Sequence, residues 1–172
     1  MKSYLIALVL AFLFVGCTKS DLSYLNDARE HLKNTNVNEA IKSYEEMIAK
    51  FPKSDSCAAA HFELGKIYQA KLVKELSAEE SYGKALDHYG IVVNRYPKSN
   101  EAPYALFMVG YIQANHTKRF DDATRTFNNF LSDYPNHELA SAAQDELDYM
   151  GLSPEDILQK KLADGQDNIK LN

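Results

Sequence analysis

Residues Lys84–Asn100, KALDHYGIVVNRYPKSN, carry a pattern that occurs three times along the chain. Each copy begins at a small residue, and an aromatic residue follows four positions later. Apolar residues follow at seven and eight positions, a second aromatic residue at eleven and a proline at twelve. The copies are Ala40, Tyr44, Met47, Ile48, Phe51 and Pro52; Ala85, Tyr89, Val92, Val93, Tyr96 and Pro97; and Ala123, Phe127, Phe130, Leu131, Tyr134 and Pro135.

This spacing predicts one amphipathic α-helix in each copy. Residues at these offsets share one face of a helix. The proline ends the helix, because it has no N–H to donate and its ring clashes with the preceding turn. Three copies with the same internal spacing indicate an array of helical repeats, an architecture that presents a long binding surface.

The composition fits a single globular domain. The chain has 172 residues, of which 45% are hydrophobic and 25% are charged, and its formal net charge is −5. Lysine and arginine are interspersed with aspartate and glutamate along the predicted helices. Because no basic patch stands out, we expect no nucleic-acid partner, and solubility accounts for the acidity.

The N-terminus has the features of an export signal. Lys2 precedes the apolar run Tyr4–Val15. This run is too short to span a bilayer and fits the hydrophobic region of a signal peptide. It ends in Phe14-Val15-Gly16-Cys17, which resembles the lipobox of bacterial lipoproteins, with Phe14 where leucine is usual.

The lipobox resemblance implies a lipid anchor. It implies a signal peptide over residues 1–16, acyl chains on Cys17 and an acylated linker over residues 17–20. Thr18 after the cysteine favours the outer membrane. We expect no cofactor other than this anchor, and an ordinary secretory signal with an incidental cysteine is the alternative.

The second cysteine has a packing explanation. Once Cys17 is acylated, Cys57 is the one thiol left, so no intramolecular disulfide can form. Cys57 follows Pro52 by five residues, and alanine stands at the matching positions 102 and 140. We therefore expect a small apolar site between helices and no redox or nucleophilic role.

The segments before each copy also align. Leu64-Gly65 and Val109-Gly110 follow a proline at the same distance, and Ala28 takes the glycine position in the first unit. An apolar-glycine pair followed by the small, aromatic and proline helix resembles the tetratricopeptide repeat, a helix-turn-helix unit of about 34 residues. The resemblance implies an all-α solenoid of about three and a half helical hairpins with a C-terminal capping helix.

The intervals between prolines, 45 and 38 residues, exceed the usual repeat length. Ser77 and Glu80 form a predicted capping box that starts the second helix of unit two about a turn early. We expect the preceding helix to run from Cys57 to about Glu75, so that the extra length lies in helix.

The C-terminus predicts a cap for the array. Residues 138–150 form an unpaired helix with Asp148 at the glycine position, and Ser153 starts a last helix. We expect Ile157, Leu158 and Leu162 to cover the exposed end of the stack. The repeat domain then spans residues 21–163, and residues 164–172 form a flexible tail.

The long aromatic-proline junctions and the lipobox together resemble those of BamD-like outer-membrane lipoproteins, and the repeats are also similar to those of the Tol-associated protein CpoB. The resemblance implies a lipid-anchored scaffold on the periplasmic face of the outer membrane. It would bind envelope proteins of the barrel-assembly machinery. The alternative is an adaptor for Tol-Pal or peptidoglycan-linked envelope maintenance.

No motif for catalysis stands out. The five histidines are scattered, and the sequence contains no HExxH motif, no CxxC motif and no glycine-rich phosphate loop. We expect no enzyme and no metal site. For Gly83 and Gly90, seven residues apart in one predicted helix, we expect close helix packing.

The predicted partner site is the groove that the first helix of each unit lines in tetratricopeptide arrays. The family's groove positions carry over to Leu22, Leu25, Arg29 and Lys33; to Phe62, Lys66 and Gln69; and to Tyr104, Phe107, Tyr111 and Asn115. Such a strip suits an extended or helical peptide. The alternative for these aromatic residues is packing between neighbouring repeats.

Overall fold

The computed structural model describes residues 19–170, with side chains as far as Ala163. The predicted signal peptide over residues 1–16 and the acylation site Cys17 lie outside the described residues. The regular elements of the described part are all helices. They are α1 (Asp21–Lys33), α2 (Val37–Lys50), α3 (Ser56–Gln69), α4 (Ala78–Arg95), α5 (Ala102–Tyr111), the π-helical turn η1 (Ile112–His116), α6 (Phe120–Asp133), α7 (Ala140–Tyr149) and α8 (Pro154–Lys170).

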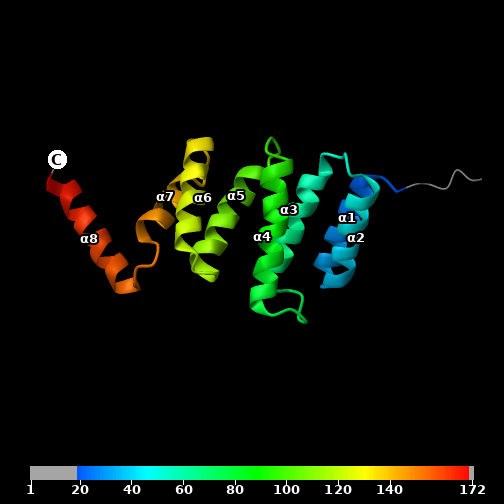
Figure 1. Cartoon of the computed structure of the whole chain (residues 1–172), viewed down its shortest axis with the longest axis horizontal. Helices are drawn as coiled ribbons and strands as arrows, with labels where there is room; N and C mark the ends of the chain where they lie inside the picture. Colours follow the sequence, from blue (N-terminus) through cyan, green and yellow to red (C-terminus); the bar gives the residue numbers. More distant parts are fainter. Residues whose placement is uncertain (1–18, 171–172) are drawn as a thin grey trace, which may run out of the picture.

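The helices form consecutive hairpins that stand side by side along the long axis of the molecule (Figure 1). Helix α1 packs on α2, α3 on α4, and α5 on α6, and each hairpin also packs against the next one. This arrangement confirms the predicted all-α array of tetratricopeptide type.

In two of the hairpins, the contact of an aromatic ring with a glycine fixes the distance between the two helices. A Cβ atom added to Gly65 in α3 would lie 2.6 Å from Cε1 of Tyr89 in α4, and one on Gly110 would lie 2.9 Å from Cε1 of Phe127. Both rings are fully buried. The repeated small and aromatic residues therefore meet at the helix contacts, as the pattern predicts.

The aromatic-proline pairs end the second helix of each unit, as predicted. The N–H groups of Phe51, Tyr96 and Tyr134 donate to the carbonyl oxygens of Met47, Val92 and Phe130, which closes the last turn each time. Cys57 is fully buried and its Sγ lies 3.2 Å from the carbonyl oxygen of Phe51. This confirms the small apolar site predicted for Cys57.

The expected long helix from Cys57 to about Glu75 is wrong. Helix α3 ends at Gln69, because Lys71 adopts a left-handed conformation (φ 52°) and the N–H of Leu72 returns to the carbonyl oxygen of Ile67. These bonds close the helix end as a Schellman motif. The extra residues lie in the following loop and in α4, whose predicted capping box is confirmed.

The π-helical turn, which the sequence analysis did not predict, absorbs one inserted residue. In the first unit the left-handed turn residue Thr35 follows Ala28 by seven positions, whereas in the third unit Lys118 follows Gly110 by eight. In both units the small residue of the next helix comes five positions after the turn residue. The extra residue therefore widens the end of the helix into a π turn.

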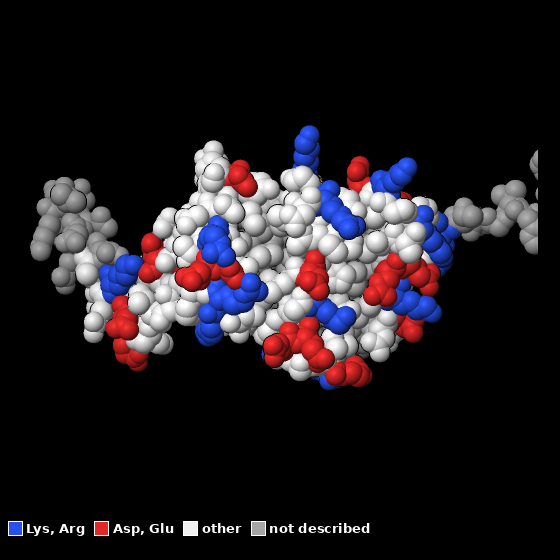
Figure 2. Space-filling model, viewed as in Figure 1, with Lys and Arg blue, Asp and Glu red and all other residues white. Residues whose placement is uncertain are grey.

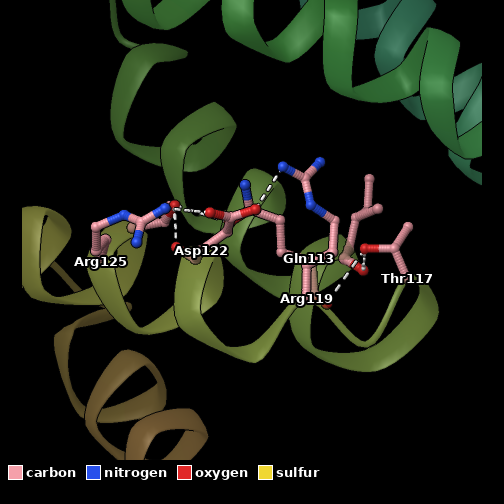
Figure 3. Close-up of polar contacts among 7 residues, drawn as sticks. Gln113, Thr117, Arg119, Asp122 and Arg125 are labelled. Atoms are coloured by element: carbon pink, nitrogen blue, oxygen red, sulfur yellow. Dashed lines mark hydrogen bonds and ion pairs between the residues drawn. The ribbon is translucent and has the colours of Figure 1, made fainter.

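Polar contacts hold this wide turn in place (Figure 3). The backbone N–H of Arg119 donates to the carbonyl oxygen of Gln113 at 2.7 Å, and the Thr117 hydroxyl lies 3.3 Å from the same oxygen. Asp122 lies between Arg119 and Arg125 and forms an ion pair with each. The start of α6 is thereby tied to the end of η1.

The terminal helix forms, but its leucines do not cover the end of the array. Leu158 and Leu162 are 59% and 58% exposed. Helix α8 instead presents Lys160 to α7, where its Nζ donates to the carbonyl oxygen of Asp148 at 2.7 Å and lies 5.3 Å from the centre of the Tyr149 ring. In Figure 1, α8 projects away from α7. The predicted cover is therefore wrong for both leucines.

Helix α8 continues to Lys170. The domain boundary at residue 163 and the flexibility of residues 164–172 stay predictions. One further expectation needs correction. Close packing at Gly83 and Gly90 is wrong, because no atom of a neighbouring segment lies within 4 Å of a Cβ added to either glycine.

We predict opposite stability effects for Gly65→Ala and Gly83→Ala. Gly65→Ala should lower the free energy of unfolding by about 1–3 kcal/mol, because the new methyl group overlaps a buried tyrosine ring. Gly83→Ala should raise it by up to about 1 kcal/mol, because alanine favours a helix and meets open space here. Urea titrations followed by circular dichroism measure both changes. Equal midpoints for the two variants would contradict this role for Gly65.

Candidate partner-binding face

The candidate site is the solvent-facing side of the first helix of each unit. We call it the inner face, because these helices line the concave side in tetratricopeptide arrays. It comprises equivalent positions on four helices: Leu22, Asn26, Arg29 and Lys33 on α1; Ala59, Glu63, Lys66 and Ala70 on α3; Tyr104, Met108, Tyr111 and Asn115 on α5 and η1; and Ala142, Glu146 and Tyr149 on α7. All of them are exposed or half-buried.

The structure places most of the predicted groove residues on this face. Arg29, Lys66 and Asn115 are exposed, and Tyr104 and Tyr111 are half-buried. The exposure of these side chains is what a partner site requires. Their binding role itself stays a prediction.

Phe107 and Leu25 do not belong to the inner face. They are 7% and 3% exposed, respectively. The Phe107 ring packs edge-on against Phe127 and Phe130, with centroid distances of 5.6 and 5.9 Å. Phe107 is therefore a buried core residue, but these ring contacts lie within the third unit and not between neighbouring repeats.

Gln69 is half-buried, and its side chain serves the packing of the second unit. Its Oε1 accepts a hydrogen bond from the Tyr89 hydroxyl at 2.7 Å. Burial raises the pKa of Tyr89, which keeps the phenol in the protonated form that donates this bond. Gln69 thus satisfies a buried hydroxyl.

Aromatic side chains form a continuous strip from α3 across α5 to the link that precedes α7. The Phe62 ring lies 6.4 Å from the Tyr104 ring, and the Tyr104 ring meets His137 edge-on at 4.9 Å. The Tyr104 hydroxyl donates to Oε1 of Glu138 at 2.6 Å, which raises the pKa of this phenol. Nζ of Lys66 lies 5.7 Å from the centre of the Phe62 ring.

A hollow of about 730 Å³ opens beside the first two units. Leu25 and Ala59 contribute apolar lining, and the link over residues 95–101 contributes Arg95, Lys98 and Glu101. The sequence analysis did not assign this link to a binding surface. The sequence feature that could have indicated this link is the long aromatic-proline junction, because it places residues 98–101 beside the start of α5.

The sequence analysis also missed the acidic residues of α7 and its preceding loop. Glu138 accepts the bond from Tyr104, and Oε2 of Glu146 accepts a bond from Nδ2 of Asn115 at 3.0 Å. Two of the four predicted groove residues of the third unit, Tyr104 and Asn115, therefore contact carboxylates. The repeat spacing could have located Glu146, because it stands at the position of Glu63 in the next first helix.

A histidine pair lies between α3 and α4, away from the inner face. The Nδ1 atoms of His61 and His88 are 3.1 Å apart, and the Tyr68 ring stacks on His88 at 5.5 Å. Burial, then the neighbouring His88 and Arg95, lowers the pKa of His61 to about 4. At neutral pH the pair shares one hydrogen bond between uncharged rings.

Neither a metal-binding cluster nor a membrane-spanning helix is found in the part of the chain that the structure describes. No group of three or more histidine, cysteine or acidic side chains within residues 19–163 is arranged to hold a metal ion. None of the helices in that part of the chain has the length and apolar content needed to cross a bilayer.

The hairpin array and its inner face define a helical-repeat protein of tetratricopeptide type. Comparison with family models identifies it further, because residues 18–152 match the family YfiO, described as outer membrane lipoprotein. The chain belongs to this family, which confirms the resemblance to BamD-like lipoproteins and makes it an envelope protein. The comparison with individually curated proteins finds no match.

We predict that the histidine pair makes the fold acid-sensitive. The pKa of His61 falls from an ordinary 6.5 to about 4 on folding, so between these values the unfolded chain binds more protons. Stability should therefore fall as the pH drops from 6.5 to 4, by on the order of 2–3 kcal/mol. Urea titrations across this pH range measure the loss.

The double variant His61→Leu/His88→Thr should lose most of this pH dependence. The third unit carries Leu106 and Thr126 at the equivalent positions, so the replacements suit the fold. The control is His31→Gln, which changes a half-buried histidine of α1 outside the pair. This variant should keep the dependence of stability on pH. A double variant with the slope of the natural protein would refute the role of the pair.

Proposed function

We propose that the protein is a lipid-anchored scaffold on the periplasmic face of the outer membrane that holds other envelope proteins on its inner face. The outer-membrane β-barrel assembly machinery is the proposed partner. The family match over residues 18–152 carries this proposal, because it spans the whole repeat array. The half-buried aromatic side chains of α3 and α5 and the charged side chains of α1 and α3 supply a surface for a polypeptide.

The proposed scaffold acts by binding and carries out no reaction. Polar groups of the inner face contact one another within a helix, as in the Glu63–Lys66 ion pair at 2.8 Å, and between elements, as in the Asn115–Glu146 hydrogen bond at 3.0 Å. This arrangement suits recognition of a flexible segment by side chains held on rigid helices. The second proposal, an adaptor for Tol-Pal or peptidoglycan-linked proteins, uses the same face and anchor.

We expect photo-crosslinkers at Tyr104 and Lys66 to capture the partner in cells. A crosslinker at Asn128, an exposed position on α6, is the matched control and should capture much less. Recovery of barrel-assembly proteins from the inner-face positions supports the first proposal, whereas Tol, Pal or peptidoglycan enzymes support the second. Equal capture at Asn128 would contradict a partner site on the inner face.

We expect Cys17→Ser to release the protein from the membrane fraction. Loss of the acyl chains removes about 0.8 kcal/mol of membrane affinity for every buried methylene group. Cys57→Ala is the control, because its thiol is buried in the fold, and it should stay with the membrane. Membrane retention of Cys17→Ser after removal of its signal peptide would rule out the proposed anchor.

A further inference from the structure

The charges of the inner face are ordered along the array. On α1, the positions Leu22, Asn26, Arg29 and Lys33 include two cations and no acid. On α3, Glu63 and Lys66 neutralise each other in an ion pair. Helix α5 contributes uncharged Tyr104, Met108 and Tyr111. Helix α7 contributes Glu146, and the loop before it adds Glu138, whose carboxylate lies beside Tyr104 at the edge of the inner face.

Within the described residues, the cations at the basic end form no ion pair. Arg29 and Lys33 take part in none of the ion pairs found among residues 19–163. The pKa of Tyr44, raised to about 12 chiefly by burial, is raised further by Glu63 and lowered by Arg29. The charges of Glu63 and Arg29 therefore act in opposite directions on the same buried hydroxyl.

The charges at the acidic end are held in place by uncharged groups. Glu138 accepts from the Tyr104 hydroxyl, and Glu146 accepts from the Asn115 amide. Neither donor is a cation, and neither carboxylate takes part in the ion pairs found among residues 19–163. An aromatic and apolar stretch, Phe62 to Tyr111, separates the two charged ends.

We propose that the segment held on the inner face is extended and ordered by charge, with acidic residues against α1, apolar or aromatic residues against α3 and α5, and basic residues against α7. This inference rests on the proposed scaffold function and specifies the chemistry of its partner. Neighbouring helices pack roughly 8–10 Å apart, so four such helices span about 30 Å. An extended chain covers that distance with about nine residues.

Charge order selects the partner segment more than it strengthens binding. Exposed ion pairs contribute little affinity each, whereas opposed like charges penalise a segment that binds in reverse. Nucleic acid and anionic lipid surfaces carry negative charge throughout, so the carboxylates near α7 would repel them. Figure 2 shows acidic side chains among the basic ones along the face in view. A polypeptide with separated charges satisfies both ends.

Synthetic peptides test the proposed order. The ordered peptides carry glutamates at one end, leucine and tyrosine in the middle and lysines at the other end, with about nine residues between the charge clusters. Two versions place the glutamates at the amino or the carboxyl terminus, because the face fixes charge order and not chain direction. A third peptide has the same composition with alternating charges. Fluorescence anisotropy with the full chain measures binding, and a photo-crosslinker at the glutamate end reports its position.

We expect one ordered peptide to bind about tenfold more tightly than the alternating peptide, a difference of about 1.4 kcal/mol, and its glutamate end to crosslink to α1. Arg29→Glu/Lys33→Glu should remove the preference. Lys42→Glu/Lys74→Glu, which changes exposed lysines elsewhere on the surface, alters the net charge equally and should keep it.

Two outcomes would overturn the charge order while leaving the scaffold function intact. One is equal binding of ordered and alternating peptides that still requires Tyr104 and Tyr111. The other is a glutamate end that crosslinks to α7. If no peptide binds and crosslinkers at Tyr104 and Lys66 also capture no partner in cells, the scaffold function itself fails.

Discussion

The contact of an aromatic ring with a glycine determines the geometry of this array. Tyr89 lies so close to Gly65, and Phe127 to Gly110, that no side chain fits between them. This contact brings the two helices of a hairpin together and fixes their rotation about their axes. The rotation then decides which residues of α3 and α5 face solvent. The composition of the inner face therefore depends on a contact buried behind it.

The repeat pattern predicts the hairpins, their contact residues and their ends, because each depends on local spacing. The pattern fails for features that the spacing of residues does not determine. The loop over residues 70–77 forms because Lys71 enters a left-handed turn that lysine rarely adopts, and a sequence pattern gives no warning of it. The π turn was visible only as one extra residue between Gly110 and Lys118, which a longer helix or loop could equally have absorbed.

The sequence predicted the candidate site only in part, again because the spacing of residues does not determine every contact. Phe62 and Phe107 occupy equivalent positions, yet Phe107 lies in the core against Phe127 and Phe130 whereas Phe62 stays half-buried beside Tyr104. Burial at one repeat position depends on the side chains of the neighbouring units, which differ between copies. Equivalence in sequence therefore predicts the face of the helix but not the depth of the side chain.

The two ends of the inner face differ in how firmly their charges are held. Hydrogen bonds from Tyr104 and Asn115 hold the carboxylates of Glu138 and Glu146, so these two glutamate side chains lose little conformational freedom when a partner binds. Arg29 and Lys33 have long exposed side chains, which lose conformational freedom when a partner binds. In the proposed complex the acidic end thus contributes positional specificity. The basic end contributes long-range attraction, which acts before contact and speeds association.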